Sequence, residues 1–346
     1  MSVLKLLLWP LAVIYDVVMN IRNRLYDLKL KPSVSFAIPI IGVGNLAVGG
    51  TGKTPMVEYI IRTLGGSFKL ATLSRGYGRK TKGFRLATPD DTPKTLGDEP
   101  YQLFNKYGSS VVVAVGEDRA YAIPHLLDGR PDVQVIVLDD AFQHRRVTPG
   151  FSILLSEYSK PFYDDHVMPF GRLREGPEGA NRADVIIITK CPESLSENDK
   201  MKIMYRVHAY SNKPVFFTTI RYGEPQPLLN YAKPFTKQVI LLTGIAMPLP
   251  LKDYVVKNFT LVKHLEFRDH YFYTKTDLQT MAKLVSEFKE GQVSILTTEK
   301  DKVKLESDEL KSLAESLPIF YLPIEMKFIG NGKDFDVLLH DFVNRG

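Results

Sequence analysis

The stretch Ala47-Val-Gly-Gly-Thr-Gly-Lys-Thr54 decides the fold, and it follows directly on the apolar run 36–43. Its glycines lack a Cβ, so the backbone can curl with several N–H groups pointing inward at phosphate oxygens. The lysine supplies a positive charge, and the last threonine offers a hydroxyl to Mg²⁺. The pattern predicts a phosphate-binding loop, although Ala47 stands where the first glycine is usual. We expect the residues that hold ATP to be Gly49, Gly50, Thr51, Gly52, Lys53 and Thr54.

The residues after the loop favour the same interpretation. Residues 53–64 have a helical pattern, and Pro55 fits the first turn, where its missing N–H is not needed. The positive end of this helix dipole would face the phosphates. The competing interpretation is a glycine-rich turn without a ligand. Such a turn needs no strand before it and no helix after it, whereas a phosphate-binding loop needs both, and this sequence has both patterns in the required order.

Composition limits the classes of protein that fit the chain. Its 346 residues suggest two domains, and 44% apolar and 24% charged residues are ordinary for a soluble globular protein. The formal net charge of +6 suits anionic ligands or a membrane surface, but no dense basic run indicates nucleic acid. Cys191 is the only cysteine, which excludes an intrachain disulfide and a cysteine-based zinc cluster and fits a reducing compartment.

Short apolar runs alternate with helical patterns, which predicts parallel βαβ units. In the first part of the chain, we expect strands at 36–43, 69–73, 111–115, 133–138, 151–155 and 185–189, and helices at 53–64, 100–106, 118–127 and 196–210. In the second part, we expect strands at 239–243, 293–297 and 319–322, and helices at 275–290, 303–316 and 334–344.

The pattern as a whole predicts an α/β protein with two domains. A P-loop NTPase-type parallel sheet domain would span residues 32–213, and a smaller Rossmann-like α/β domain residues 235–346. Between them, residues 214–234 are rich in Pro, Gly, Tyr and Asn and contain a possible ribbon at 215–220, so they are assigned to a linker. The last helix could pack on either domain.

The first 31 residues form a separate segment. Leu4 to Met19 is nearly all apolar, but three polar or helix-disfavouring residues interrupt it, and it is shorter than the roughly twenty residues of a spanning helix. A helical wheel places Leu11, Tyr15 and Val18 on one side and Asp16 and Asn23 on another. We predict an amphipathic helix on the cytoplasmic face of a membrane, with Trp9 and Tyr15 at the interface and basic residues behind them. The alternative is a helix packed on the core of the protein itself.

A second motif is Val135-Ile-Val-Leu-Asp-Asp140, a buried strand that ends in two acids. A carboxylate at the end of such a strand lies beside the phosphate loop and can hold its magnesium. We expect Asp139 or Asp140 to bind the metal, directly or through water. The alternative is that the two acids cap the following turn.

Other segments carry polar groups that suit an anionic substrate. Asp98 stands at a probable helix start, where it can act as a cap or as a general base, and His270 lies in a polar, aromatic loop. Arginines that follow strands or begin helices can bind anions, although surface salt bridges would use the same residues. The candidates for substrate contacts are Arg75, Arg79, Arg119, His144, Arg174 and Glu175.

Taken together, these motifs resemble those of the tetraacyldisaccharide 4′-kinase family of lipid A biosynthesis. The matching segments follow one another in the expected order over most of the chain, and they are residues 43–55, 74–79, 97–100, 138–145, 171–175, 267–270 and 297–301. The segment 297–301, Thr-Thr-Glu-Lys-Asp, also reads as a capping box at a helix start.

The resemblance implies a function and a set of roles. The γ-phosphate of ATP would be transferred to the 4′-hydroxyl of an acylated glucosamine disaccharide 1-phosphate, giving lipid IVA at the cytoplasmic face of the inner membrane. Lys53 and Thr54 would bind ATP and Mg²⁺, Asp98 would be the base, and His270 would be its partner across a domain cleft. The family implies no nucleic-acid or protein partner.

Two other functions fit parts of the sequence. A membrane-associated P-loop ATPase that acts as a switch through partners would share the Gly-Gly-Thr-Gly-Lys-Thr core, but Val48 stands where related partitioning ATPases carry a lysine. A soluble kinase for a small metabolite would use the N-terminal segment as a core helix. Neither alternative needs Asp98 and His270.

Overall fold

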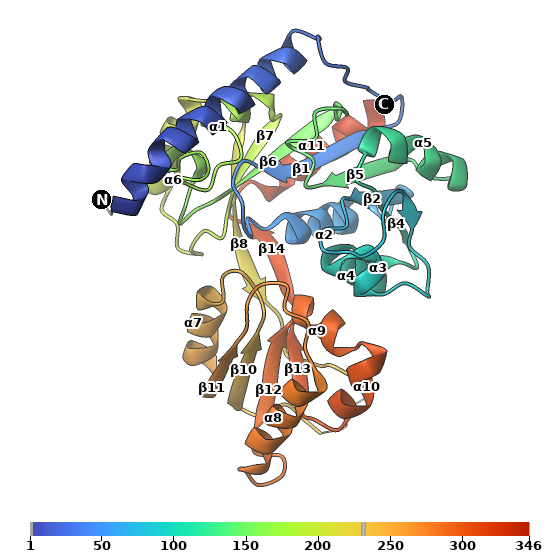
Figure 1. Cartoon of the computed structure of the whole chain (residues 1–346), viewed down its shortest axis with the longest axis vertical. Coiled ribbons are helices and arrows are strands. Elements are labelled where there is room, and N and C mark those ends of the chain that lie inside the picture. The colour runs from blue at the N-terminus through green and yellow to red at the C-terminus, as the bar shows by residue number, and fades with distance from the viewer. Residues whose placement is uncertain (1–2, 230, 232, 346) are drawn as a thin grey trace.

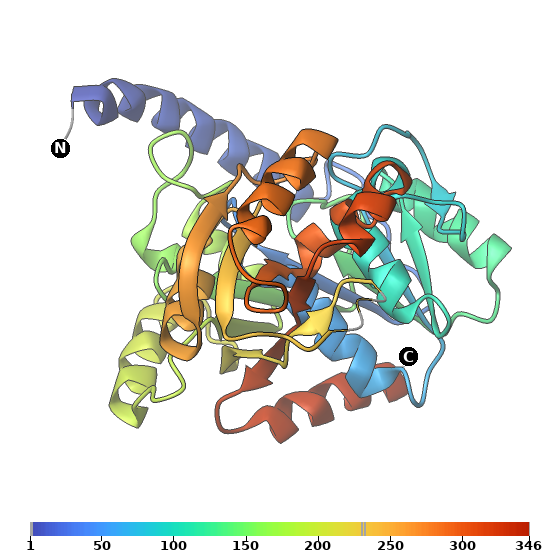
Figure 2. The same cartoon turned by 90° about the horizontal axis from the view of Figure 1, so that it is seen from below.

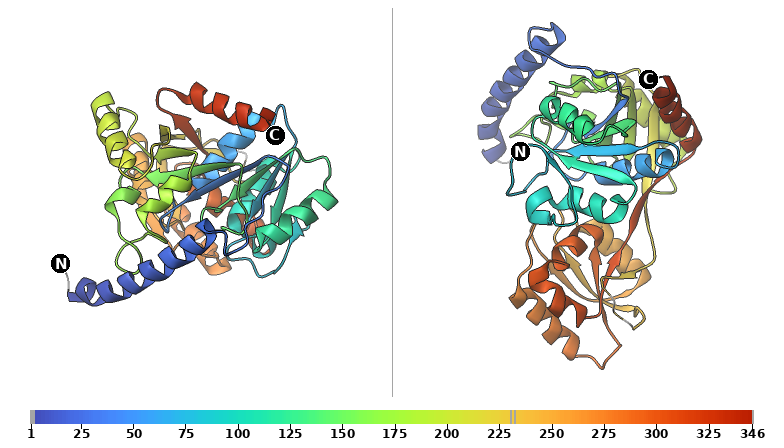
Figure 3. Two further views of the ribbon diagram at one scale, coloured as in Figure 1. Left: turned by 90° about the horizontal axis from the view of Figure 1, so that it is seen from above. Right: turned by 90° about the vertical axis from the view of Figure 1, so that its right-hand side faces the viewer.

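The computed structural model describes residues 3–229, 231 and 233–345. The chain forms two α/β lobes of unequal size, and two strands run from the larger lobe towards the smaller one (Figure 1). Helix α1 (Val3–Asp27) lies along the outside of the larger lobe, and its N-terminal end projects beyond it (Figure 3).

The larger lobe is built on a nine-stranded sheet in the order β14-β8-β7-β6-β1-β5-β2-β4-β3. All neighbouring strands run parallel except at the two edges, where β14 and β3 are antiparallel to their partners. The strands are β1 (Ile40–Asn45), β2 (Leu70–Ser74), β3 (Arg85–Leu86), β4 (Val111–Val115), β5 (Val135–Asp139), β6 (Phe151–Glu157), β7 (Val185–Thr189), β8 (Val215–Tyr222) and β14 (Ile324–Phe328).

Helices cover both faces of this sheet, as the continuous burial of β1, β2, β5 and β7 requires. One face packs against α2 (Lys53–Leu64) and α11 (Gly332–Arg345), and the other packs against α5 (Arg119–Gly129) and α6 (Glu197–His208). Short helices α3 (Pro93–Leu96) and α4 (Asp98–Tyr107) follow β2, and two 3₁₀ turns span Phe162–Asp164 and Pro177–Arg182.

The smaller lobe is a five-stranded sheet in the order β11-β10-β12-β13-β9, parallel except for β9 at its edge. Its strands are β9 (Gln226–Pro227), β10 (Gln238–Thr243), β11 (Thr260–Glu266), β12 (Ser294–Thr298) and β13 (Ile319–Leu322). Its helices are α7 (Leu249–Asn258), α8 (Lys275–Ser286), α9 (Glu299–Leu305) and α10 (Asp308–Glu315). This is the Rossmann-like second unit that the sequence predicts.

The structure corrects the segment between the lobes. Residues 214–234 were predicted to be a linker, but β8 pairs parallel with β7 inside the large sheet and only its C-terminal end leads to the smaller lobe. The chain then returns, because β14 pairs antiparallel with β8 and α11 packs beside α2 on the larger lobe (Figure 2). Sequence periodicity cannot report this return, because the partner of a strand is a long-range choice.

Two helices also differ from the prediction. The expected helix 303–316 is divided into α9 and α10, because Ser307 adopts an extended conformation between them. The expected helix start at 100 lies two residues earlier, so that Asp98 belongs to the first turn of α4. Strands β3, β9, β11 and β14 and helix α7 were not predicted, since most of them are short or lie at a sheet edge.

The side of helix α1 that faces the protein carries the buried Ala12 and two polar residues that form hydrogen bonds with the larger lobe. Tyr15 donates a hydrogen bond to the carbonyl of Arg174 at 2.8 Å, and the amide of Asn23 donates to Glu175 at 2.6 Å. The opposite side exposes a row of apolar side chains: Trp9, Leu11, Val13, Ile14, Val17, Val18 and Ile21. The sequence placed Tyr15 with Leu11 and Val18 at an interface, and that assignment is wrong because Tyr15 points inward.

Candidate active site

The predicted phosphate loop connects β1 to α2 at the carboxyl edge of the large sheet. Gly49 and Gly52 have φ values of 111° and 90°, a region that side chains with a Cβ rarely adopt, and the space next to the Cα of Gly49 and of Gly50 is open. Lys53 and Thr54 form the first turn of α2, whose free N–H groups face the loop. The loop therefore has the backbone needed to surround a phosphate.

Neighbouring strands hold the loop in place. Asn45 donates a hydrogen bond to the Thr51 hydroxyl at 2.8 Å, and Thr189, at the end of β7, donates to the Thr51 carbonyl at 2.8 Å. Ala47, the departure from the usual glycine, forms an antiparallel bridge with Leu173 and is buried. A side chain is tolerated at position 47 because it packs sideways against this segment and not into the loop.

The two acids after β5 lie beside the loop, and they differ in environment. Asp140 has a φ of 50° and is close to two cations, with Lys53 Nζ at 3.5 Å and Arg174 Nη1 at 3.2 Å. Burial alone would raise the pKa of Asp140, but the Lys53 and Arg174 charges outweigh burial and lower it. Asp140 is therefore a carboxylate held between two cations beside the predicted phosphate loop.

Asp139 is buried and its Oδ1 has no hydrogen-bond partner. Burial, together with the nearby Asp140 and Glu99 charges, raises the pKa of Asp139 to about 6 despite the opposing charge of Lys53. A buried carboxylate oxygen without a partner fits a cation or a metal-bound water. Among the described residues no group of three or more His, Cys, Asp and Glu side chains could hold a metal by itself.

The buried Arg119 and the half-buried His144 form a layer next to the two acids. The Arg119 guanidinium donates to three carbonyls, those of Gly116, Glu117 and Asp139, and the Arg119 N–H donates to His144 Nε2 at 3.2 Å. Burial lowers the pKa of Arg119 to about 10 and, with the Arg119 charge, lowers the pKa of His144 to about 4. His144 is thus neutral at pH 7, and Arg119 supports the Asp139 backbone.

The predicted base and its partner meet across the two lobes. His270 Nδ1 lies 3.0 Å from Asp98 Oδ2, although 172 residues separate them in the chain. The side chain of Asp98 is buried in the first turn of α4, and His270 has a φ of 57° in the loop after β11. The hydrogen bond to Asp98 raises the pKa of His270, against the opposing effects of burial and of the Lys300 charge.

Lys300 completes this interlobe cluster. Its ammonium lies 3.0 Å from Glu99, 3.2 Å from Asp269 and 3.3 Å from His270 Nε2. When His270 is neutral, its Nδ1–H donates to Asp98 and its Nε2 accepts from Lys300. Only half of the expected capping box is present at the start of α9: the Thr298 hydroxyl accepts from the Asp301 N–H, but the Asp301 carboxylate accepts from the Thr298 hydroxyl and the Gly244 N–H in place of the Thr298 N–H.

A second ionic group joins the lobes farther from the loop. Lys106 on α4 lies 2.7 Å from Glu58 on α2 and 2.9 Å from Glu299 on α9. Burial raises the pKa of Glu58 although Lys106 opposes this, while the two carboxylates outweigh burial and raise the pKa of Lys106. One lysine thus serves two buried carboxylates from different lobes.

The remaining predicted residues fall into two groups. Arg174 and Glu175 lie beside the loop, where Arg174 donates to Asp140 and the buried Glu175 accepts from Gln143 and Arg182. Arg75 is exposed after β2, and its charge lowers the pKa of Arg119. Arg79 pairs with Glu117 at 2.5 Å and donates to the Gly83 carbonyl, so that it braces the 76–83 turn.

Sequence reasoning missed several residues of the site. Asn23 and Gln143 tie α1 to Glu175, and Lys300 and Lys106 tie the lobes together. The sequence indicated a capping box in the segment 297–301, but it did not single out Lys300 as a residue of the site. Nothing in the local pattern around Lys106 distinguishes it from a solvated surface lysine.

The fold and the site define a P-loop nucleotide-binding protein whose ligand edge is met by a second lobe. A family model described as Tetraacyldisaccharide-1-P 4′-kinase matches residues 4–344. Curated relatives carry the name tetraacyldisaccharide 4′-kinase. The relative from Flavobacterium johnsoniae is 40% identical over 99% of this chain and 98% of its own, and the one from Bacteroides thetaiotaomicron is 40% identical over 94% and 90%.

A solved structure has the same architecture. It is described as an apo form of LpxK from Aquifex aeolicus in complex with ATP, and it matches with a TM-score of 0.75 and 26% identity over 98% of this chain and 99% of that one. The chain belongs to the tetraacyldisaccharide 4′-kinase family, as its motifs predicted. Within the described residues, no helix combines the length and the apolar character needed to cross a bilayer.

Proposed function

We propose that the protein transfers the γ-phosphate of ATP to the 4′-hydroxyl of tetraacyldisaccharide 1-phosphate in lipid A biosynthesis. The observation that carries the proposal is the Asp98–His270 contact of 3.0 Å, which brings a carboxylate and an imidazole to the sheet edge that holds the phosphate loop. An ATPase that acts only as a switch has no need of this pair, and family membership supports the kinase.

The nucleotide would bind to residues of the larger lobe, at the edge of its sheet. Residues 49–54 would surround the phosphates, with Lys53 at the β- and γ-phosphates. Mg²⁺ would be held by the Thr54 hydroxyl and by Asp139 or Asp140, and it would neutralise charge on the transferring group. The buried, unpaired Oδ1 of Asp139 supports this assignment.

The acceptor hydroxyl would be activated at the junction between the two lobes. Asp98 would accept the proton of the 4′-hydroxyl while the hydroxyl oxygen forms a bond to the γ-phosphorus. The bond between the γ-phosphorus and the β-phosphate oxygen would break at the same time, which releases ADP. His270 would orient the Asp98 carboxylate through its Nδ1. Lys300 would keep the loop of His270 at the cleft, because it bridges Glu99 of one lobe and Asp269 of the other.

The outer face of α1 supports contact with a membrane surface, and we place that surface on the cytoplasmic side. Seven apolar side chains between Trp9 and Ile21 are exposed while the polar side of the helix is bonded to the protein. A helix of the protein's own core would show the opposite arrangement. Such a helix would hold the enzyme at the bilayer surface, where the sugar head group of the lipid meets water.

The first experiment follows the label from γ-labelled ATP in Mg²⁺ and mild detergent, with and without tetraacyldisaccharide 1-phosphate. Label in the lipid, absent in Asp98→Ala, is the expected result. Free labelled phosphate released at a rate indifferent to the lipid would instead identify an ATPase.

A second experiment removes residues 1–20. We expect the truncated protein to stay folded and to lose association with vesicles, because Arg22 and Asn23, which also bind the larger lobe, remain. Unfolding of the truncated protein would assign α1 to the core. The matched control is Trp9→Ser with Ile14→Ser, which changes only the exposed face.

A further inference from the structure

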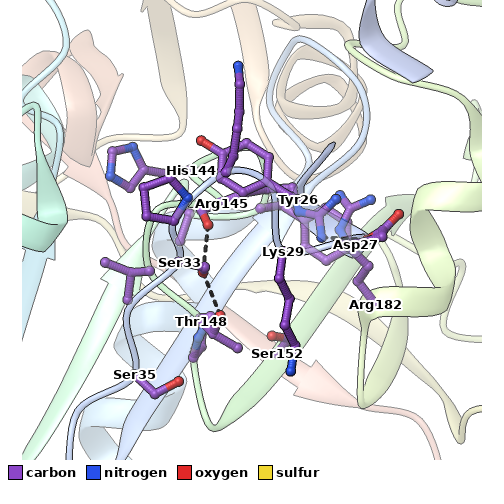
Figure 4. Close-up of a pocket in the computed structure, with 17 residues that line it drawn as sticks. Tyr26, Asp27, Lys29, Ser33, Ser35, His144, Arg145, Thr148, Ser152 and Arg182 are labelled. Atoms are coloured by element: carbon purple, nitrogen blue, oxygen red, sulfur yellow. Dashed lines mark hydrogen bonds and ion pairs between the residues drawn. The ribbon is translucent and has the colours of Figure 1, made fainter. Parts of the chain in front are cut away.

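A pocket of about 630 Å³ lies beneath the end of α1, and Lys29, Arg145 and Ser152 are among the residues that line it (Figure 4). Among the described residues that line it, none belongs to the phosphate loop, to the two acids after β5 or to the Asp98–His270 junction. The pocket is therefore separate from the proposed transfer site. The groups that can influence the proposed base are those that contact the His270 ring.

The His270 ring is held from both lobes. From the larger lobe, Asp98 Oδ2 lies 3.0 Å from Nδ1, and the Tyr77 ring has its centroid 5.3 Å from that of the imidazole. From the smaller lobe, Lys300 Nζ lies 3.3 Å from Nε2, and Asp269 Oδ1 accepts from the His270 backbone N–H at 3.0 Å. Separation of the lobes would therefore remove Asp98 and Tyr77 but leave Lys300 and Asp269 beside the ring.

The contact between Lys300 and the ring has only one possible direction. An ammonium group has three N–H donors and no acceptor. Its three neighbours all accept, with Glu99 Oε1 at 3.0 Å, Asp269 Oδ1 at 3.2 Å and His270 Nε2 at 3.3 Å. In a neutral imidazole one nitrogen accepts and the other carries the proton. Because Nε2 accepts from Lys300, the proton lies on Nδ1, the nitrogen that faces Asp98.

The surrounding charges keep Lys300 in its donor form. Burial alone would lower the pKa of Lys300, but the Glu99 and Asp269 charges outweigh burial and raise it. Lys300 also lies in the first turn of α9, where the helix dipole disfavours a cation, and its three acceptors offset that cost. For the ring, the Asp98 contact and the Glu99 and Asp269 charges favour protonation, whereas burial and the Lys300 charge oppose it.

We propose that Lys300 is a positioning residue that fixes the proton of neutral His270 on Nδ1 before the two lobes meet. Asp98 then meets an N–H donor when the lobes come into contact. The other tautomer would place the Nδ1 lone pair against the Asp98 carboxylate, and the carboxylate would lose its orienting hydrogen bond. The inference rests on the proposed function, because it concerns the partner of the proposed base.

The test reads the tautomer directly, by ¹⁵N NMR of the full chain labelled at histidine, in nonionic detergent micelles above the pKa of His270. Loss of one signal set in His270→Gln assigns this residue among the seven histidines. The wild type should show a protonated Nδ1 and an unprotonated Nε2. Asp98→Ala should show the same tautomer, because Lys300 and Asp269 remain in place.

Lys300→Met should lose this single tautomer. Without the ammonium, Asp269 Oδ2 is the acceptor nearest Nε2, at 3.7 Å, and it favours a proton on that nitrogen. The pKa of His270 should rise in the same variant, because the opposing charge is gone. We expect kcat to fall about ten- to a hundredfold, the range of one charged hydrogen bond, with the KM for ATP nearly unchanged. Lys300→Arg keeps a donor and should restore the tautomer and most of kcat.

Two further variants separate this role from simple bracing of the lobes. Glu99→Gln removes the interlobe partner of Lys300 but leaves Asp269, so the Nδ1–H tautomer should persist. Lys302→Met is the matched control on α9, because Lys302 lies beside Glu306 at 3.8 Å and over the Tyr321 ring. It should change neither the tautomer nor kcat.

An unchanged Nδ1–H signal in Lys300→Met would overturn the proposal, even if kcat falls, because Lys300 would then only brace the lobes. Loss of that signal in Asp98→Ala would also overturn it, since Asp98 and not Lys300 would select the tautomer. The proposed function fails separately. A wild-type protein with the expected tautomer that labels no lipid contradicts only the kinase assignment.

Discussion

The phosphate loop and the Asp98–His270 junction lie at one sheet edge but are built in opposite ways. The loop and the acids after β5 come from adjacent parallel strands, β1 and β5, of one sheet. The junction joins a helix start of the larger lobe to a loop of the smaller lobe. The first is fixed by the sheet itself, whereas the second exists only while the lobes are in contact.

The difference has a consequence for catalysis. Nucleotide binding should survive a disturbance of the interface between the lobes, because none of its residues comes from the smaller lobe. Transfer to the acceptor should not survive such a disturbance, because Asp98, the proposed base, is oriented by His270 from the smaller lobe. Closure of the lobes would also exclude water and limit hydrolysis of ATP.

The largest effect is expected for Lys53→Ala. Loss of the cation at the β- and γ-phosphates, and of the partner of Asp140, should reduce lipid phosphorylation by about a thousandfold or more. Label transfer from ATP measures it. Lys69→Ala is the control, since Lys69 is exposed before β2 at the opposite edge of the sheet. Activity close to wild type in Lys53→Ala would remove the phosphate-loop assignment.

Asp98→Ala tests the other side of the comparison. Loss of a general base should lower kcat by about two to four powers of ten, while binding of ATP is retained. Because Asp98 and His270 act as a unit, His270→Ala should lower kcat far less in the Asp98→Ala background than in the wild-type protein. Titration with a fluorescent nucleotide measures the affinity. If ATP affinity collapses and turnover at saturating ATP survives, Asp98 is a nucleotide ligand.

Lys106→Met probes the interface without touching the reacting groups. It leaves Glu299 without a cation and Glu58 with only the longer Arg62 contact of 3.8 Å, and it should lower the free energy of unfolding by about 1–3 kcal/mol, since Lys106 is partly exposed. Changing both acids to Gln in the same variant should restore most of the loss. Lys94→Met is the matched control, because its interlobe pair with Glu309 is exposed to solvent and should contribute much less to stability than the Lys106 group.

The smallest effect is a dependence of the junction on pH. The Asp98 contact raises the pKa of His270 above 6.5, so its stabilisation is complete below that value and is lost as the pH rises through the folded-state pKa. The protection factors of the amides in residues 267–273, which correct for base catalysis of the intrinsic exchange, should therefore be lower at pH 9 than at pH 6. Asp98→Asn should weaken that difference, although Lys300, Glu99 and Asp269 still face His270. Equal pH dependence in both proteins would contradict the assignment.

The sequence by itself determined the elements whose chemistry is local. The glycines, lysine and threonine of 49–54 follow a buried strand, and the two acids follow another, so parallel pairing was enough to bring them together. The apolar character of residues 4–19 was also evident from the sequence, but which side of α1 faces the protein was not. An apolar row usually marks the buried side, and here Tyr15 and Asn23 are the residues in contact.

Only the tertiary structure decided where the chain returns and which distant charges meet. β14 and α11 belong to the larger lobe because they complete its sheet edge and cover the face beside α2, and no local pattern encodes that choice. Lys106 and Lys300 gain their roles from carboxylates on the other lobe. The physical reason is that periodicity reports which side of an element is apolar, whereas the partner of a charge depends on the packing of the whole chain.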